Sequence, residues 1–79
     1  MEEKIRNIVK EVLKLDDEQN ANLMDDTNLI DFGLDSLTSV EIIVNIESEF
    51  DIFTNDDDLL VENLATINLL ADLVKKYSD

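Results

Sequence analysis

The chain has 79 residues, of which 20 are acidic and 6 are basic, and it contains one Gly and no His, Cys or Pro. The net charge of −14 argues against binding of nucleic acid, because phosphate backbones attract Lys and Arg and repel an acidic surface. Without Cys or His, the chain cannot form disulfides, a Ser-His-Asp triad or most transition-metal sites, so we expect neither a catalytic nor a metal centre. Its 44% hydrophobic content is enough for folding, and its length predicts one domain over residues 1–79.

The first predicted element is an amphipathic helix from Ile5 to Leu13. Its apolar residues recur at the spacing of one helix face, and they are Ile5, Ile8, Val9, Val12 and Leu13. A polar segment without periodicity follows from Asp16 to Asp31, which predicts a long loop. We expect Leu23, Met24 and Leu29 to enter the core and hold this loop in place.

A second helix is predicted from Ser36 to Phe50, because the 3.6-residue period resumes there. The apolar residues that carry this pattern are Leu37, Val40, Ile43, Val44, Ile46 and Phe50. The β-branched run Ile42-Ile43-Val44 lies inside this longer helical pattern and has no hairpin turn beside it, so a strand is disfavoured.

Two further elements complete the prediction. Asp57 to Glu62 can form a short helical turn with Leu59 and Leu60 facing inward, and Thr66 is placed to cap a last helix. The core stripe of that helix consists of Ile67, Leu70, Leu73, Val74 and Tyr77. The predicted fold is therefore all-α, a four-helix bundle with three main helices, a short third helix and a long loop between helices one and two.

The charge is unevenly distributed along the chain. All six basic residues lie at positions 4, 6, 10, 14, 75 and 76, so the segment from Leu15 to Val74 contains acidic residues and no basic one. A net charge of magnitude about 2 to 8 is enough for the solubility of a small domain. The excess therefore indicates basic protein partners, although a solvated acidic face remains the alternative explanation.

The sequence Gly33-Leu34-Asp35-Ser36-Leu37 marks the start of the second predicted helix. Gly33 can adopt a positive φ in a tight turn, and Asp35 occupies the position of an N-cap. Ser36 then opens the helix, where unsatisfied backbone N–H groups and the positive end of the dipole tolerate a phosphate ester. A serine that serves only helix initiation is the alternative.

This motif, continued by Val40-Glu41 and by Glu47-Ser48-Glu49-Phe50, resembles the acyl carrier protein family, and the resemblance covers the whole chain. It implies that Ser36 carries a 4′-phosphopantetheine arm, transferred from coenzyme A by a magnesium-dependent phosphopantetheinyl transferase. It also implies that the arm's thiol holds acyl or aminoacyl groups as thioesters for partner enzymes, while the chain itself is not an enzyme. The residues agree, since no His exists and no Lys lies within twenty residues of Ser36 to activate its hydroxyl.

The resemblance further implies a surface that meets loading enzymes, synthases and transferases with basic docking patches. The residues assigned to this partner contact are Asp35, Leu37, Val40, Glu41, Val44 and Glu47. On a helix with about 100° per residue, Glu47 shares the face of Ser36 well and Glu41 less well. Exposed acids with no partner role are the alternative for both.

We expect a monomer that binds neither nucleic acid nor membrane. No signal peptide or long apolar run is visible, so the expected location is cytoplasmic.

Three residues bear on the pathway. Many fatty-acid carriers have an acid where Thr38 and Ser48 stand, and Leu34 is more typical of polyketide-type carriers. The resemblance thus favours polyketide or hybrid polyketide/nonribosomal peptide biosynthesis, with an aminoacyl carrier or a carrier of fatty acid biosynthesis open. The alternative class is an acidic ion-binding or adaptor module without a prosthetic group, suggested by the runs Asp16-Asp17-Glu18 and Asn55-Asp56-Asp57-Asp58. Neither run gives the complete spacing of a calcium-binding EF-hand loop.

Overall fold

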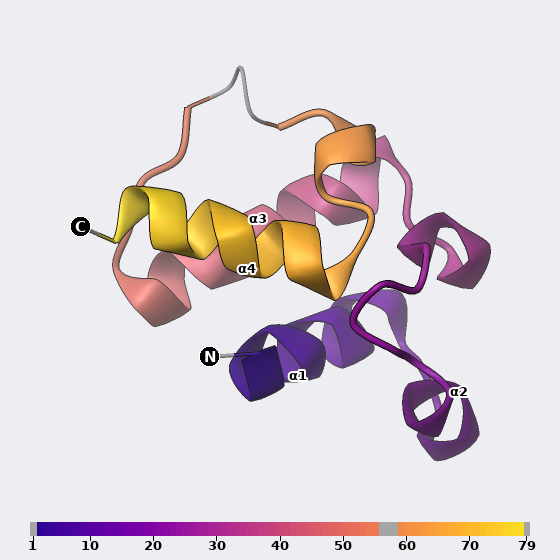
Figure 1. Ribbon diagram of the computed structural model, residues 1–79. Helices are drawn as coiled ribbons and strands as arrows, with labels where there is room; N and C mark the ends of the chain where they lie inside the picture. The colour runs from indigo at the N-terminus through magenta and orange to yellow at the C-terminus, as the bar shows by residue number, and fades with distance from the viewer. Residues whose placement is uncertain (1, 56–58, 79) are drawn as a thin grey trace.

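The computed structural model describes residues 2–55 and 59–78. The elements, in chain order, are α1 (Glu2–Leu13), α2 (Asp17–Ala21), the 3-10 turn η1 (Leu29–Phe32), α3 (Ser36–Phe50), the 3-10 turn η3 (Val61–Asn63) and α4 (Ile67–Tyr77). These two ranges contain helices and no strand, so the predicted all-α class is confirmed (Figure 1).

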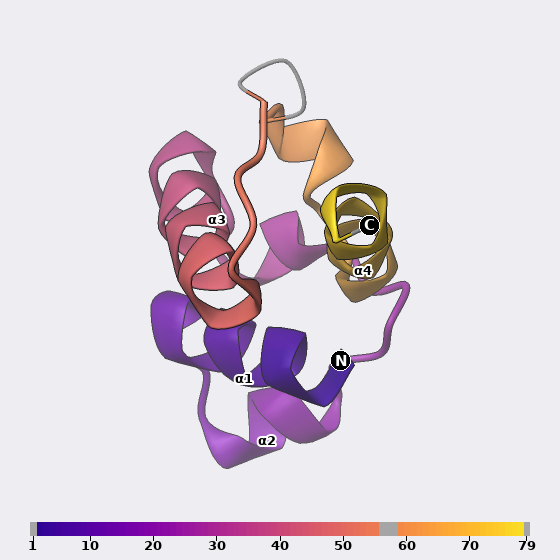
Figure 2. The same ribbon diagram turned by 90° about the vertical axis from the view of Figure 1, so that its left-hand side faces the viewer.

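The helix α1 packs against both α3 and α4, and the core lies where the three long helices meet (Figure 2). Ile5 and Val9, one turn apart on α1, are completely buried, and Ile8, Val12 and Leu13 pack at the edge of the core. The predicted stripe of α4 is likewise buried, with Tyr77 at its margin. Thr66 caps α4 as predicted, since its hydroxyl accepts the N–H of Leu69 at 3.0 Å. None of the helices in the described ranges combines the length and hydropathy needed to cross a bilayer.

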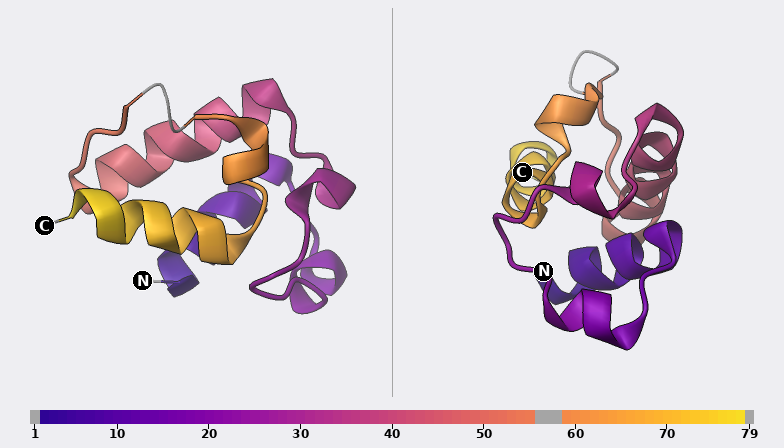
Figure 3. Two further views of the ribbon diagram at one scale, coloured as in Figure 1. Left: turned by 45° about the horizontal axis from the view of Figure 1, so that its top comes forward. Right: turned by 90° about the vertical axis from the view of Figure 1, so that its right-hand side faces the viewer.

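The segment predicted as an irregular loop contains two short helical elements, α2 and η1 (Figure 3). The helix α2 starts with a capping box, in which the Asp16 carboxylate accepts the Gln19 N–H at 2.8 Å and the Asp16 N–H donates to Gln19 Oε1 at 3.1 Å. Periodicity could not reveal a helix of five residues, because its exposed side chains form no apolar stripe. The Asp-x-x-Gln spacing was the available signal.

Long-range contacts hold this segment to the long helices. The Arg6 guanidinium donates to the Leu23 carbonyl, and its Nη2 lies 2.6 Å from Asp25 Oδ1. The Leu29 N–H donates to the Ala65 carbonyl at 2.7 Å. Leu23 and Leu29 are buried as predicted, but Met24 is 64% exposed and its prediction was wrong. Met24 begins a turn closed by Thr27, on the solvent side of inward-facing Leu23.

The short third helix is also placed differently from the prediction. The structure has η3 at Val61–Asn63, whereas the predicted turn began at Asp57; Asp57 and Asp58 lie outside the described residues. Leu59 packs against the core as expected, but Leu60 is 54% exposed. Leu60 has an extended backbone, in which successive side chains point to opposite sides, so both leucines cannot face inward.

The orientation of α3 places only part of its apolar pattern in the core. Ile43 and Ile46 are buried, but Leu37, Val40 and Val44 are exposed. The buried face instead includes Ile42 and Ser39. Apolar residues occupy most of the circumference of α3, so the pattern alone could not identify the face that packs on α1.

Candidate functional site

A tight turn leads into α3. Gly33 ends η1 with φ 103°, and its N–H donates to the Ile30 carbonyl at 3.2 Å. A Cβ at Gly33 would meet nothing within 4 Å, so the backbone conformation, and not crowding, favours glycine. The next residue, Leu34, is buried and fixes where the chain enters the helix.

Asp35 and Thr38 form a capping box at the start of α3. The Asp35 carboxylate accepts the Thr38 N–H at 2.8 Å, and Thr38 Oγ1 accepts the Asp35 N–H at 2.8 Å. The hydrogen bonds from the Thr38 backbone and hydroxyl lower the pKa of the Asp35 carboxyl below its ordinary value of 3.8. Asp35 is therefore the predicted N-cap, and it is ionised at neutral pH.

Ser36 is the first residue of this 15-residue helix and is exposed. Its carbonyl accepts the hydroxyl of buried Ser39 at 3.0 Å, whereas its own hydroxyl bonds to no group in the described part of the chain. The Asp35 carboxylate is hydrogen-bonded to Thr38 and accepts no hydrogen bond from the Ser36 hydroxyl. The Ser36 hydroxyl is therefore exposed and accessible for covalent attachment of a phosphate ester.

An apolar row lies on the same exposed side of α3. Leu37, Val40 and Val44 are 69%, 47% and 57% exposed, and their spacing places them on one face. Glu41 lies between them in sequence and is exposed. Five of the six residues predicted for partner contact, Asp35 included, are therefore exposed along α3 or at its start. We call Leu37, Val40, Glu41 and Val44 the outer face of α3.

Glu47 differs from the other predicted contact residues. Its Oε2 accepts both the backbone N–H of Thr54 at 2.8 Å and the Thr54 hydroxyl at 3.1 Å, and the side chain is partly buried. The carboxylate thus holds the segment that follows α3. Sequence reasoning missed Thr54, because a side-chain bond that spans seven residues across the end of α3 belongs to no capping motif.

Comparison with known proteins identifies the family. The family model described as a phosphopantetheine attachment site matches residues 3–74. The acyl carrier protein of Karelsulcia muelleri (strain GWSS) is 38% identical over 77 residues, which cover 96% of this chain and 87% of that protein. The chain belongs to the acyl carrier protein family.

Other relatives have the same family name. An acyl carrier protein of Buchnera aphidicola is 37% identical over 76 residues, covering 96% of this chain and 90% of that protein. A chloroplastic acyl carrier protein of Brassica campestris is 36% identical over 74 residues, covering 94% of this chain. This chain spans about half, 52%, of the length of that chloroplastic relative.

Family membership establishes the coarse biochemistry of this carrier. Its cofactor is covalently attached 4′-phosphopantetheine, and its partners are a phosphopantetheinyl transferase and enzymes that handle acyl groups. It is a carrier protein and not itself an enzyme.

No group of three or more metal-liganding side chains occurs among residues 2–55 and 59–78.

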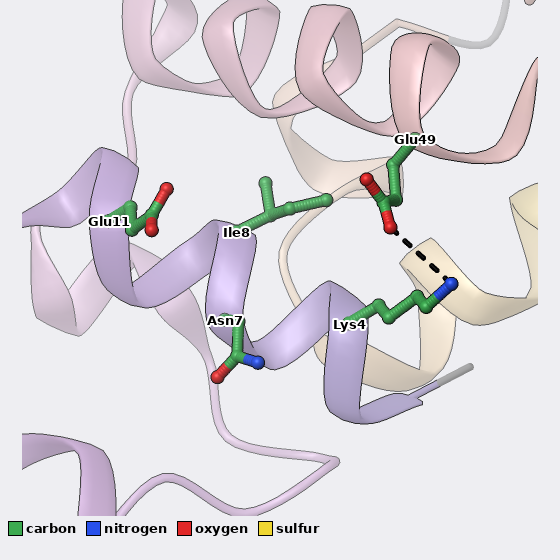
Figure 4. Close-up of a pocket in the computed structure, with 5 residues that line it drawn as sticks. All are labelled: Lys4, Asn7, Ile8, Glu11 and Glu49. Atoms are coloured by element: carbon green, nitrogen blue, oxygen red, sulfur yellow. Dashed lines mark ion pairs between the residues drawn. The ribbon is translucent and has the colours of Figure 1, made fainter.

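A hollow between α1 and the C-terminal part of α3 lies apart from the predicted site (Figure 4). It is lined by Lys4, Asn7, Ile8, Glu11 and Glu49. An ion pair at its edge joins Lys4 Nζ to Glu49 Oε1 at 3.4 Å, so this hollow marks a contact between two helices. It contains none of the residues predicted for cofactor or partner binding.

Proposed function

We propose that this carrier receives its 4′-phosphopantetheine arm on Ser36 and delivers acyl intermediates from there to partner enzymes. The observation that supports this assignment is the exposed Ser36 hydroxyl, which no described group engages, at the start of α3. When attached, the arm supplies a thiol that holds the acyl group as a thioester. The proposal treats residues 1–79 as one carrier domain.

The residues around Ser36 determine how the arm is attached. The Ser36 oxygen forms a bond to the phosphorus that carries the pantetheine arm of coenzyme A, the pyrophosphate bond breaks with adenosine 3′,5′-bisphosphate as the leaving group, and the Ser36 proton passes to a base. Asp35 is poorly suited as that base, because its bonds to Thr38 lower its pKa. The sequence contains no His, so the transferase has to provide the base.

The outer face of α3 provides the proposed partner surface. Exposed Leu37, Val40 and Val44 offer apolar contact area, while Asp35 and Glu41 offer charge for Lys and Arg on the partner. The electrostatic contribution acts mainly on the association rate and on partner choice, and salt weakens it. A carrier that must leave each enzyme after reaction benefits from such contacts. The proposed form is a cytoplasmic monomer.

For the pathway, the proposal remains polyketide or hybrid polyketide/nonribosomal peptide biosynthesis, with fatty acid biosynthesis as the second candidate. Leu34 and Ser48 support the first. Thr38 supports it less than the sequence suggested, because Thr38 has a structural role in the capping box with Asp35. Loading assays with purified malonyl, aminoacyl and fatty-acyl transferring enzymes will distinguish these pathways.

The attachment site is tested by intact mass after incubation with coenzyme A, Mg²⁺ and a broad-specificity phosphopantetheinyl transferase. We expect the wild type to gain one arm and Ser36→Ala to gain none while keeping its helical circular dichroism. Ser48→Ala is the matched control, because Ser48 is an exposed serine on the same helix, and it should be modified normally. Modification of Ser36→Ala would show that another residue is the attachment site.

A further inference from the structure

Phe53 is the most exposed of the large apolar side chains in the described part of the chain, at 85%. It lies in the segment that leaves α3 and passes the end of α4 (Figure 2). A phenyl ring in water forgoes the free energy of burial, and an isolated ring of this kind often has no role. The surrounding contacts indicate a role for this one.

The residues on both sides of Phe53 are fixed. Asp51 ends α3 in a left-handed conformation, and the Ile52 N–H donates to the Glu47 carbonyl at 3.1 Å, which directs Ile52 into the core. On the other side, Thr54 is held by the Glu47 carboxylate at 2.8 Å and 3.1 Å. Glu47 therefore binds the backbone before Phe53 and the residue after it.

A third contact extends this anchoring to α4. The Asn55 N–H donates to the Tyr77 hydroxyl at 3.3 Å. With Ile52 buried and Thr54 and Asn55 bonded to α3 and α4, the backbone on both sides of Phe53 is anchored while its ring lies exposed. Binding through this ring needs little further ordering of the backbone, which favours its use as a contact.

We propose that Phe53 is an apolar docking contact for the acyl-handling partner enzymes, and that Glu47 is the positioning residue that presents it. The partner surface is an apolar pocket bordered by Lys or Arg. This inference rests on the proposed function, because it extends the partner surface beyond the outer face of α3.

Charge and reach support this occupant. The stretch of chain that contains Phe53, from Glu47 to Glu62, has acidic residues and no basic one, which favours a partner with Lys or Arg at the border of its pocket. The 15 residues of α3 span about 22 Å at about 1.5 Å per residue. A standard interface of about 800 Å² per partner is wide enough to include both the Ser36 end of α3 and Phe53.

The test uses the holo protein and a purified fatty-acyl ligase that charges carrier thiols with ATP. Phe53→Ala should raise the KM for the holo protein about tenfold and leave kcat nearly unchanged, because a docking contact affects binding more than chemistry. Phe53→Leu should recover most of the affinity. Because the ring is exposed, the melting temperature should not change.

Glu47 variants separate positioning from charge. Glu47→Gln retains an acceptor oxygen for Thr54 but loses the charge, so its KM should stay within about twofold of wild type. Glu47→Ala removes the acceptor and should raise KM several-fold. Glu41→Gln is the matched control for charge on the outer face of α3, and it should weaken binding mainly at low salt.

The outcomes distinguish a failure of the docking inference from a failure of the proposed function, arm attachment at Ser36. If the wild type gains no arm at Ser36, the proposed function fails before docking is measured. If the arm is attached and Phe53→Ala has a wild-type KM, the docking inference alone is overturned.

Equal effects of Glu47→Gln and Glu47→Ala would show that Glu47 acts through its charge, against its proposed positioning role. A wild-type dimer that Phe53→Ala converts to a monomer would assign the ring to a second copy of the chain, against the proposal.

Discussion

Asp35 and Thr38 cap each other at the start of α3, with both N–H groups donating to the other residue's side chain at 2.8 Å. This reciprocal pair uses the carboxylate that stands immediately before Ser36. The hydroxyl of Ser36 is consequently left free at the surface, although it lies between two strongly hydrogen-bonded residues.

The first prediction concerns pH. A carboxyl whose pKa is lower in the folded state adds stability above its unfolded pKa and loses that stability as the pH falls through the folded pKa. Asp35→Asn should therefore destabilise the protein at pH 7, and the difference from wild type should shrink below pH 3.8. Urea unfolding of both proteins across this range checks the prediction. A difference independent of pH would contradict it.

The second prediction tests the orientation of α3. Ile42 is fully buried and Val44 is 57% exposed. Ile42→Ala should lower the free energy of unfolding by about 2–5 kcal/mol, because it leaves a cavity. Val44→Ala should change it by less than about 0.5 kcal/mol, since Ala favours helix and little burial is lost. Chemical denaturation measures both, and comparable losses would mean that Val44 packs in the core.

The third prediction concerns the end of α3. Asp51 has φ 54°, a left-handed conformation that favours glycine, and its charge lies at the negative end of the helix dipole. Asp51→Gly should raise the free energy of unfolding by about 0.5–1 kcal/mol. Lys14→Gly is the control, because Lys14 has φ 56° beyond the end of α1 but carries a favourable charge. Its gain in thermal or urea unfolding should be smaller, and an equal gain would exclude the contribution of charge.

The fourth prediction concerns salt. Among residues 2–55 and 59–78, three exposed or partly exposed ion pairs join α1 to later segments, namely Lys4–Glu49, Arg6–Asp25 and Lys10–Asp17. Such pairs contribute about 0–1 kcal/mol each, whereas a net charge of −14 repels itself across the whole molecule. Raising NaCl from about 10 to about 500 mM should therefore raise the melting temperature, because salt screens the repulsion. Thermal unfolding by circular dichroism checks this. A lower melting temperature would mean that the ion pairs outweigh the repulsion.

Much of the site could be predicted because it depends on residues that are close in sequence. Gly33, Asp35 and Ser36 form a turn, a cap and a helix start through bonds that span only a few residues. The amphipathic stripes of α1 and α4 predicted their buried faces for the same reason, since each has one apolar side. The resemblance implied a partner contact for Leu37, Val40 and Val44, but the apolar pattern alone could not show that they face outward. A helix with apolar residues around most of its surface can pack in more than one rotation.

The sequence by itself thus determined that the chain forms three long helices and that Ser36 opens the second of them, because local propensity, periodicity and capping all act within one or two turns. Only the tertiary structure decided that α1 selects the Ile42 face of α3, that Met24 and Leu60 face solvent, and that Glu47 bonds to Thr54. Each of these depends on which distant surfaces meet when the core closes, and the free energy of that packing is not encoded in any short run of residues.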